Sequence, residues 1–139
     1  MKVLIVFNHP APYKVKLFNE LSKYVDLTVI FERKKAKNRP KEFYSETDYK
    51  FNAIVLKHGY MGNEGSFSGR VKSHIRKHRK EYDFIIMNGY SHLSEMMAIS
   101  YMIKKRIPYL LMINGGFPKK DLFFKIEISE NHLISRQNA

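Results

Sequence analysis

Polar and glycine residues follow three short apolar runs of the chain, and residues of these types bind hydroxyl and phosphate groups. Asparagine amides both donate and accept hydrogen bonds, glycines expose backbone N–H groups, and aromatic rings stack on flat apolar surfaces. A ligand that is rich in hydroxyls, or that carries phosphate, suits such a set. The candidate binding residues are Asn8, Pro12, Tyr13, Asn88, Gly89, Tyr90, Asn114, Gly115 and Gly116.

No catalytic constellation is complete in the sequence. Of the six histidines, only His74 and His78 are spaced by one helical turn; no third metal ligand accompanies them, so we interpret them as a solvated pair. A serine nucleophile on a sharp turn needs a G-x-S-x-G pattern, which the chain lacks. We therefore assign no catalytic residue, and we expect neither a bound metal nor a cofactor.

The elements that must position the candidate residues alternate between strand and helix. Such alternation is typical of an α/β fold with a doubly wound, mostly parallel sheet, Rossmann-like, with helices on both faces and the first strand central. Ligands bind such a sheet beyond the carboxyl ends of its strands, so the candidate residues should meet at one edge. The predicted strands are 1–7, 26–31, 51–56, 83–87 and 108–113, and the predicted helices are 13–23, 67–80 and 91–104.

Two segments of the chain predict loops. Residues 33–50 are polar and highly charged, which indicates a long exposed loop. Residues 58–69 hold four of the seven glycines, but they lack the spacing of a dinucleotide fingerprint, and no Gly-Lys-Ser/Thr sequence ends them as in a phosphate-binding loop. We interpret this second segment as a flexible connector.

Two of the predicted helices differ in how much they can bury. The helix at 67–80 offers only Phe67, Val71 and Ile75 to a core, which places it at the edge of the sheet. The helix at 91–104 carries many apolar residues and is predicted to be well buried. Its candidate core residues are Leu93, Met96, Met97, Ile99, Met102 and Ile103.

The chain is strongly basic, with 25 Lys and Arg against 13 Asp and Glu and a formal net charge of +12. The excess gathers at 33–41, 70–80 and 104–106. A charge this large favours anionic partners such as lipid, nucleic acid or phosphate-bearing substrates, beside the plainer alternative of a basic surface with no specific partner. The candidate residues for contact with a membrane or another anion are Arg70, Lys72, Arg76, Lys77, Arg79 and Lys80.

The remaining composition bounds the class of protein. At 139 residues the chain is long enough for one domain with its own core, and it has no cysteine for disulfides or thiolate metal sites. The first apolar run lacks the features of a signal peptide, and no apolar stretch approaches the roughly 20 residues of a spanning helix. We expect a cytoplasmic protein that contacts the inner face of the membrane through its basic helix.

The order of three N-terminal segments resembles the start of a family-4 (group 1) glycosyltransferase. These segments are Lys-Val-Leu-Ile-Val-Phe at 2–7, Pro-x-Pro-Tyr-Lys-x-x-Leu-Phe-x-x-Leu at 10–21 and Val-Asp-Leu-Thr-Val-Ile at 25–30. The segments at 82–92 and 107–116 are similar to the fourth and fifth strand signatures of the N-terminal domain of that family. The resemblance covers roughly residues 1–117.

Such enzymes have the GT-B fold, in which two Rossmann-like domains face a cleft. The N-terminal domain holds the acceptor, and the C-terminal domain holds the nucleotide-sugar through a pair of glutamates. The resemblance implies that residues 1–139 are the acceptor domain of a retaining glycosyltransferase, without the nucleotide-sugar-binding domain, and that they transfer no sugar alone. The implied acceptor is a glycan or a lipid-linked saccharide in cell-surface polysaccharide or glycolipid synthesis.

Two features depart from the pattern of the family. Asn88 and Asn114 stand where many members carry histidine, and Pro-Ala-Pro at 10–12 replaces a common Gly-Gly. Asparagine binds sugar or phosphate oxygens but cannot serve as a general base near neutral pH. The family is thought to use the phosphate of the donor as the base, so this departure leaves transfer open.

Two other functions also remain open. One is a nucleic-acid-binding domain that uses the basic segments on phosphates, for which helix-turn-helix, zinc and RRM signatures are lacking. The other is a stand-alone α/β protein that binds a nucleotide or a flavin.

Overall fold

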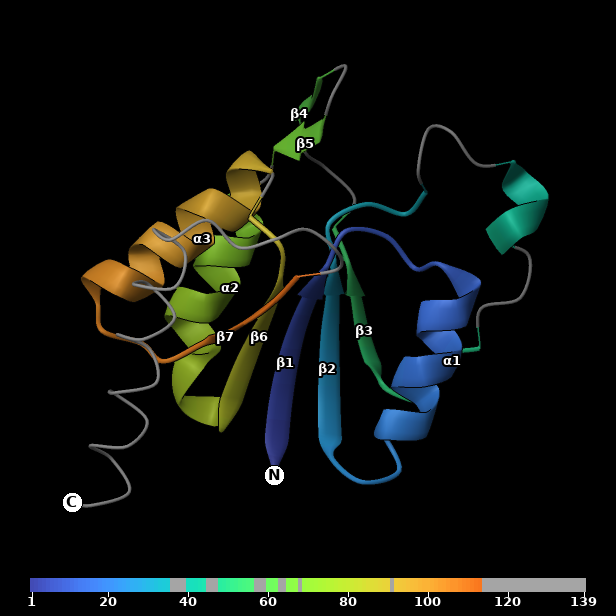
Figure 1. Cartoon of the computed structure of the whole chain (residues 1–139), viewed down its shortest axis with the longest axis horizontal. Helices are drawn as coiled ribbons and strands as arrows, with labels where there is room; N and C mark the ends of the chain where they lie inside the picture. Colours follow the sequence, from blue (N-terminus) through green and yellow to red (C-terminus); the bar gives the residue numbers. More distant parts are fainter. Residues whose placement is uncertain are drawn as a thin grey trace.

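The computed structural model describes residues 1–35, 40–44, 48–56, 60–62, 65–67, 69–90 and 92–113. It confirms the predicted α/β class, because five parallel strands form one sheet in the order β3-β2-β1-β6-β7 with β1 in the centre (Figure 1). The strands of this sheet are β1 (Lys2–Phe7), β2 (Asp26–Phe31), β3 (Asn52–Val55), β6 (Phe84–Asn88) and β7 (Leu110–Met112).

Helices cover both faces of the sheet. One helix, α1, packs on the first face, while α2 and α3 lie side by side on the second (Figure 1). Because the strands are parallel, each of these helices runs back from the carboxyl edge of the sheet to the amino edge. The helical elements are α1 (Pro12–Leu21), α2 (Arg70–His78) and α3 (Leu93–Lys104), with short 3-10 turns η1 (Lys41–Tyr44) and η2 (Arg79–Glu81).

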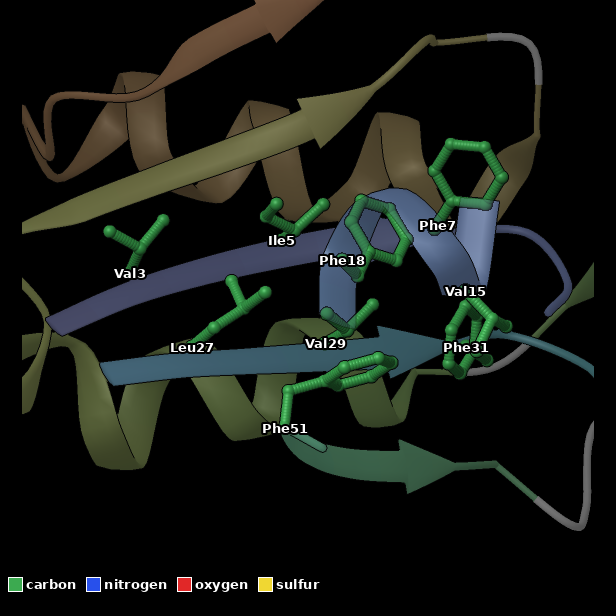
Figure 2. Close-up of a cluster of buried hydrophobic side chains, with 9 residues drawn as sticks. All are labelled: Val3, Ile5, Phe7, Val15, Phe18, Leu27, Val29, Phe31 and Phe51. Atoms are coloured by element: carbon green, nitrogen blue, oxygen red, sulfur yellow. The ribbon is translucent and has the colours of Figure 1, made fainter. Parts of the chain in front are cut away.

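Burial on both faces explains why the strands are continuous apolar runs. Along β1, Val3, Ile5 and Phe7 face α1, whereas Leu4 and Val6 face α2 and α3, and all five are at most 5 % exposed. A central parallel strand with two covered faces has no place for polar residues. Figure 2 shows the cluster on the α1 side, where side chains of β1 and β2 meet Val15 and Phe18 of α1.

The start of α1 is fixed by proline chemistry. Ala11 is extended, as the residue before a proline prefers, and Pro12 occupies the first turn, where its missing N–H has no helical partner to lose. The backbone N–H groups of Lys14 and Val15 both donate to the Ala11 carbonyl at 2.9 Å. The rigid Pro-Ala-Pro turn therefore passes directly from the end of β1 into the helix.

The prediction for α3 is confirmed for Met102, which is fully buried, and wrong for three other predicted core residues. Leu93, Met96 and Ile103 are about half exposed, at 55, 51 and 49 %. The small side chains of Ser94 and Ala98 let this helix lie close to the sheet and to α2. The carboxylate of Glu95 is also buried on the inward side of the helix. The fully buried residues of α3 are Ser94, Glu95, Ala98 and Met102.

The two predicted loops also contain ordered elements. In the segment at 33–50, η1 places Tyr44 at 9 % exposure, and Tyr49 packs on the α1-side core, so the prediction of a wholly exposed loop is wrong. Within 58–69, β4 (Tyr60–Gly62) and β5 (Gly65–Phe67) form an antiparallel hairpin in place of a flexible connector. The backbone of Phe67 thus belongs to a strand, and α2 begins three residues later.

Candidate binding site

The candidate binding residues after β1 and β6 lie at the carboxyl edge of the sheet, as predicted. The pairing of β1 with β2 continues past both strands, because Glu32 N–H donates to Phe7 O and Arg33 N–H donates to Asn8 O, each at 3.0 Å. Asn88 is the last residue of β6, and the N–H of Gly89 donates to Met112 O at 3.0 Å. The strand ends therefore form one continuous rim.

Each candidate residue on this rim has a distinct setting. Asn8 and Asn88 are half-buried, so their amides can still meet a ligand. Gly89 has a φ of 89°, in the left-handed region that favours glycine, and this turn directs the chain from β6 toward α3. Tyr13 and Tyr90 are 65 and 47 % exposed, and the Lys14 ammonium lies 5.7 Å from the centre of the Tyr13 ring. Both rings are therefore accessible for stacking, Tyr13 with a cation over one face.

Four further candidates complete the account of the predicted site. Pro12 is half-buried in the first turn of α1 and serves to fix the helix start. Asn114, Gly115 and Gly116 lie outside the described residues, so their place relative to the rim stays a prediction.

A histidine and a tyrosine add an interaction that the sequence did not suggest. His9 follows Asn8 on the rim, and its Nδ1 lies 3.1 Å from the hydroxyl of Tyr44, with the two rings edge to face at 5.9 Å between centroids. The turn η1 thereby folds over the end of β1. The only signal in the sequence was the presence of three aromatic residues, Phe43, Tyr44 and Tyr49, within an otherwise polar, charged stretch.

Two buried carboxylates lie where β2 meets α3, and both were missed in the sequence. Glu32 is 4 % exposed and Glu95 is 1 % exposed, and the Ser94 hydroxyl donates to Glu32 Oε1 at 2.9 Å. Burial raises the pKa of Glu32 to about 7, and the charge of Glu95 adds to that rise, while the Ser94 hydrogen bond and the charge of Arg33 oppose it. Glu32 is thus partly protonated near neutral pH.

The start of α3 holds Glu95 in place. His92 is the N-cap residue, and its backbone N–H donates to Glu95 Oε2 at 3.2 Å as part of a capping box. Burial, followed by the charge of Arg33, lowers the pKa of His92, so its imidazole is neutral near pH 7. A carboxylate therefore occupies the position where the N–H groups and dipole of the helix attract negative charge.

Two polar atoms of this cluster are buried without a hydrogen-bond partner in the described part of the chain. They are Oε2 of Glu32 and Nε of Arg33. Buried polar groups are almost always paired, so unpaired ones in one cluster mark a place where a ligand or water completes the site. Within the described ranges, no group of three or more His, Asp or Glu side chains is arranged to hold a metal ion.

The basic residues of α2 and η2 point to a different part of the molecule. Because α2 runs away from the carboxyl edge, Arg76, Lys77, Arg79 and Lys80 lie near its far end, at the amino edge of the sheet (Figure 1). The chain then enters β6 beside the start of β1, where Asp83 N–H donates to Lys2 O at 2.8 Å.

Other basic residues join them there. Lys104 ends α3, Lys105 and Arg106 follow it, and all three are exposed just before β7, also at the amino edge. Arg70 stands at the opposite end of α2, and the Lys72 ammonium lies 5.8 Å from the centre of the Tyr101 ring. We call the residues at 76–80 and 104–106 the basic amino edge. Four of the six predicted anion-contact residues therefore lie at the end of the sheet opposite the candidate binding site, whereas Arg70 lies at the same end as that site.

None of the described helices has the length and apolar character needed to cross a membrane. The chain matches no protein-family model, no curated protein sequence and no solved structure.

Proposed function

We propose that the chain is the acceptor-binding domain of a retaining glycosyltransferase that acts on a polysaccharide or a lipid-linked acceptor in cell-surface glycan synthesis. The resemblance of five segments to the N-terminal domain of family-4 glycosyltransferases supports this proposal. The sheet order, with β1 central and polar residues at the carboxyl edge, is compatible with half of a GT-B fold. The nucleotide-sugar donor would bind a second domain.

The observation that carries the proposal is the acidic start of α3. In α/β proteins that bind nucleotides, phosphate usually lies at a helix N-terminus on the carboxyl edge. Here the Glu95 carboxylate accepts from the His92 N–H at that position, and Ser94 connects it to Glu32. The Glu95 carboxylate, together with Glu32 when it is ionised, repels a phosphate, whereas a sugar hydroxyl can donate to either group. This edge therefore favours a neutral, hydroxylated ligand over a nucleotide.

The other rim residues complete a surface suited to sugars. The amides of Asn8 and Asn88 can each donate to one hydroxyl and accept from another. The exposed rings of Tyr13 and Tyr90 offer flat faces for the apolar side of a sugar ring.

Neutral oligosaccharides should bind at this rim, and the rim residues should control their affinity. Titration of the isotope-labelled chain should shift the backbone amide signals of Asn88 and Gly89. Asn88→Ala and Tyr90→Ala should each lower the affinity by about tenfold, because each removes a direct contact. Tyr24→Ala removes a ring that is 82 % exposed beyond the end of α1, and it should change nothing. Affinities within about twofold of the unsubstituted chain for both rim variants would show that this edge is not the acceptor site.

We also propose that the basic amino edge contacts an anionic membrane surface. Each Lys or Arg near such a surface contributes about 1 kcal/mol, so binding needs several of them together and weakens with salt. Because this edge is opposite the candidate site, a membrane bound there leaves the glycan rim open to solvent. Nucleic acid offers the same negative charge and is the competing partner.

Charge reversal should separate these partners. Replacing Arg76, Lys77, Arg79 and Lys80 with glutamate should abolish binding to vesicles that contain anionic lipid, while oligosaccharide binding stays unchanged. The fold should survive, because α2 packs on the core through Val71 and Ile75. Reversal of three exposed lysines away from the amino edge should leave vesicle binding largely intact; this control replaces Lys16, Lys34 and Lys35. Equal binding to neutral vesicles, or tighter binding to DNA or RNA at the same salt concentration, would refute the membrane contact.

A further inference from the structure

The unpaired atoms of Glu32 and Arg33 differ in hydrogen-bonding character. Oε2 of Glu32 accepts when the carboxyl is ionised, and Nε of Arg33 only donates. The two residues are adjacent directly after β2, and both unpaired atoms are buried. The Glu32 carboxyl is bonded to Ser94 in the first turn of α3, and the charge of Arg33 acts on both Glu32 and His92, the N-cap residue of that helix. Both residues therefore lie near the start of α3.

We propose that Glu32 and Arg33 bind one hydroxyl group of the glycan acceptor, which donates to Glu32 Oε2 and accepts from Arg33 Nε–H. The inference rests on the proposed function and adds to it a specific hydroxyl-binding subsite at the end of β2. A hydroxyl is the smallest ligand group that both donates and accepts, so it satisfies both atoms at once. Glu32 is held for this role by the Ser94 hydroxyl on Oε1, which leaves Oε2 as the ligand-facing oxygen.

Other ligand groups fit this pair less well. An ammonium group could donate to Glu32, but it has nothing to accept from Arg33 and would be repelled by the guanidinium. A phosphate could accept from Arg33, but it would face the carboxylates of Glu32 and Glu95. An uncharged group that both donates and accepts hydrogen bonds can pair with Glu32 Oε2 and Arg33 Nε–H without repulsion from either residue.

Movement of the Arg33 side chain could give a ligand access to the buried atoms. Its Nε is buried, but the residue as a whole is only half-buried, and the described part of the chain gives its side chain no hydrogen bond. Its backbone is fixed by the bond to Asn8 O, so movement is confined to the side chain. A rotation of the guanidinium can therefore admit a hydroxyl without any change in the sheet.

The test follows the two side chains by NMR in the full chain. The Arg33 Nε–H signal and the Glu32 carboxyl carbon signal are recorded during titration with the methyl glycosides of common neutral hexoses, at up to about 50 mM because single sugars bind weakly. Both signals should shift together and saturate with at least one glycoside. Glu32→Gln and Arg33→Lys, which nearly preserve size, should each lower that affinity by about tenfold or more. Glu20→Gln, an exposed glutamate on α1, is the matched control and should leave it unchanged.

The outcomes separate this inference from the proposed function. If glycosides shift Asn88 and Gly89 but not the Arg33 Nε–H, the rim binds sugars and the Glu32–Arg33 subsite is refuted. If Glu32→Gln and Arg33→Lys fold normally and keep the full affinity, the subsite is likewise refuted. A third outcome also refutes the inference. In it, no glycoside shifts the Arg33 Nε–H signal, and magnetisation transfer shows that only water contacts this group, so the pair binds a structural water molecule.

Discussion

Raising the pH from about 4.5 to about 7 should lower the free energy of unfolding by on the order of 3 kcal/mol through Glu32 alone. In the unfolded chain this carboxyl has its ordinary pKa of 4.5, whereas burial and the charge of Glu95 raise its pKa in the folded chain to about 7. Between these values the folded state binds more protons, so stability falls as the pH rises. Above about pH 7 both states are ionised and the loss is complete.

Glu32→Gln should remove this dependence, because the amide does not titrate. Urea unfolding at about pH 4 and about pH 8 should show the variant gaining stability relative to the unsubstituted chain at the higher pH. Burial lowers the pKa of His74 and His92, which gives the opposite slope, but these residues are present in both proteins and cancel in the comparison.

Glu20→Gln is the control, because Glu20 affects stability with the opposite dependence on pH. Its hydrogen bond and ion pair with Lys23 lower the pKa of Glu20, so this group favours folding as the pH rises. Its removal therefore cannot produce the gain expected of Glu32→Gln. A difference between Glu32→Gln and the unsubstituted chain that stays constant with pH would contradict the raised pKa.

Phe18→Ala should lower the free energy of unfolding by about 4 kcal/mol. Phe18 is 2 % exposed, and its ring meets Phe7 edge to face at 5.6 Å and Phe51 at 5.8 Å between centroids. Truncation leaves a cavity where α1 seals the first face of the sheet, and rigid neighbouring strands cannot close it. Denaturant unfolding near neutral pH measures the change.

The adjacent residue of the same helix gives the matched control. Leu17 is 53 % exposed, so Leu17→Ala should change the free energy of unfolding by no more than about 0.5 kcal/mol. Equal effects of the two substitutions would mean that α1 does not pack through the face seen in Figure 2.

The fold was predictable because its strands are buried on both faces. The run at 26–31 has the same bounds as β2, and the central position of β1 is confirmed. Apolar content was a poorer guide to the orientation of α3. Leu93 and Met96 are exposed while Ser94 and Glu95 are buried, because close packing against α2 and the capping box set the rotation of the helix.

The sequence predicted the asparagines of the candidate site, but it did not predict the buried carboxylates, which are its most distinctive feature. Asn8 and Asn88 lie on the rim because they directly follow parallel strands. Glu32 was overlooked because it directly precedes a charged segment. In the sequence, a glutamate in that position cannot be distinguished from the first residue of an exposed loop. Its burial depends on Ser94 and Glu95, which lie far away in the sequence, and no local pattern reveals such a contact.

The position of the basic residues changes how a membrane contact would serve the proposed function. The sequence predicted contact with the inner face of the membrane through a basic helix. The amino edge carries most of this charge, and the rim lies at the other end of the strands. A membrane bound at the amino edge would orient the strands away from the lipid surface. The rim would then face an acceptor that extends away from that surface.

The central claim is that the carboxyl edge of this sheet receives a neutral glycan. Titration of the isotope-labelled chain with neutral oligosaccharides and, separately, with nucleotides and nucleotide-sugars tests it most directly. We expect saturable shifts at Asn88, Gly89 and Tyr90 with an oligosaccharide and no shifts there with a nucleotide, because the Glu95 side chain already accepts from the N-cap N–H at the start of α3, where a phosphate would otherwise bind. Saturable binding of a nucleotide at this edge, with no response to any oligosaccharide, would contradict the account and favour a nucleotide-binding protein.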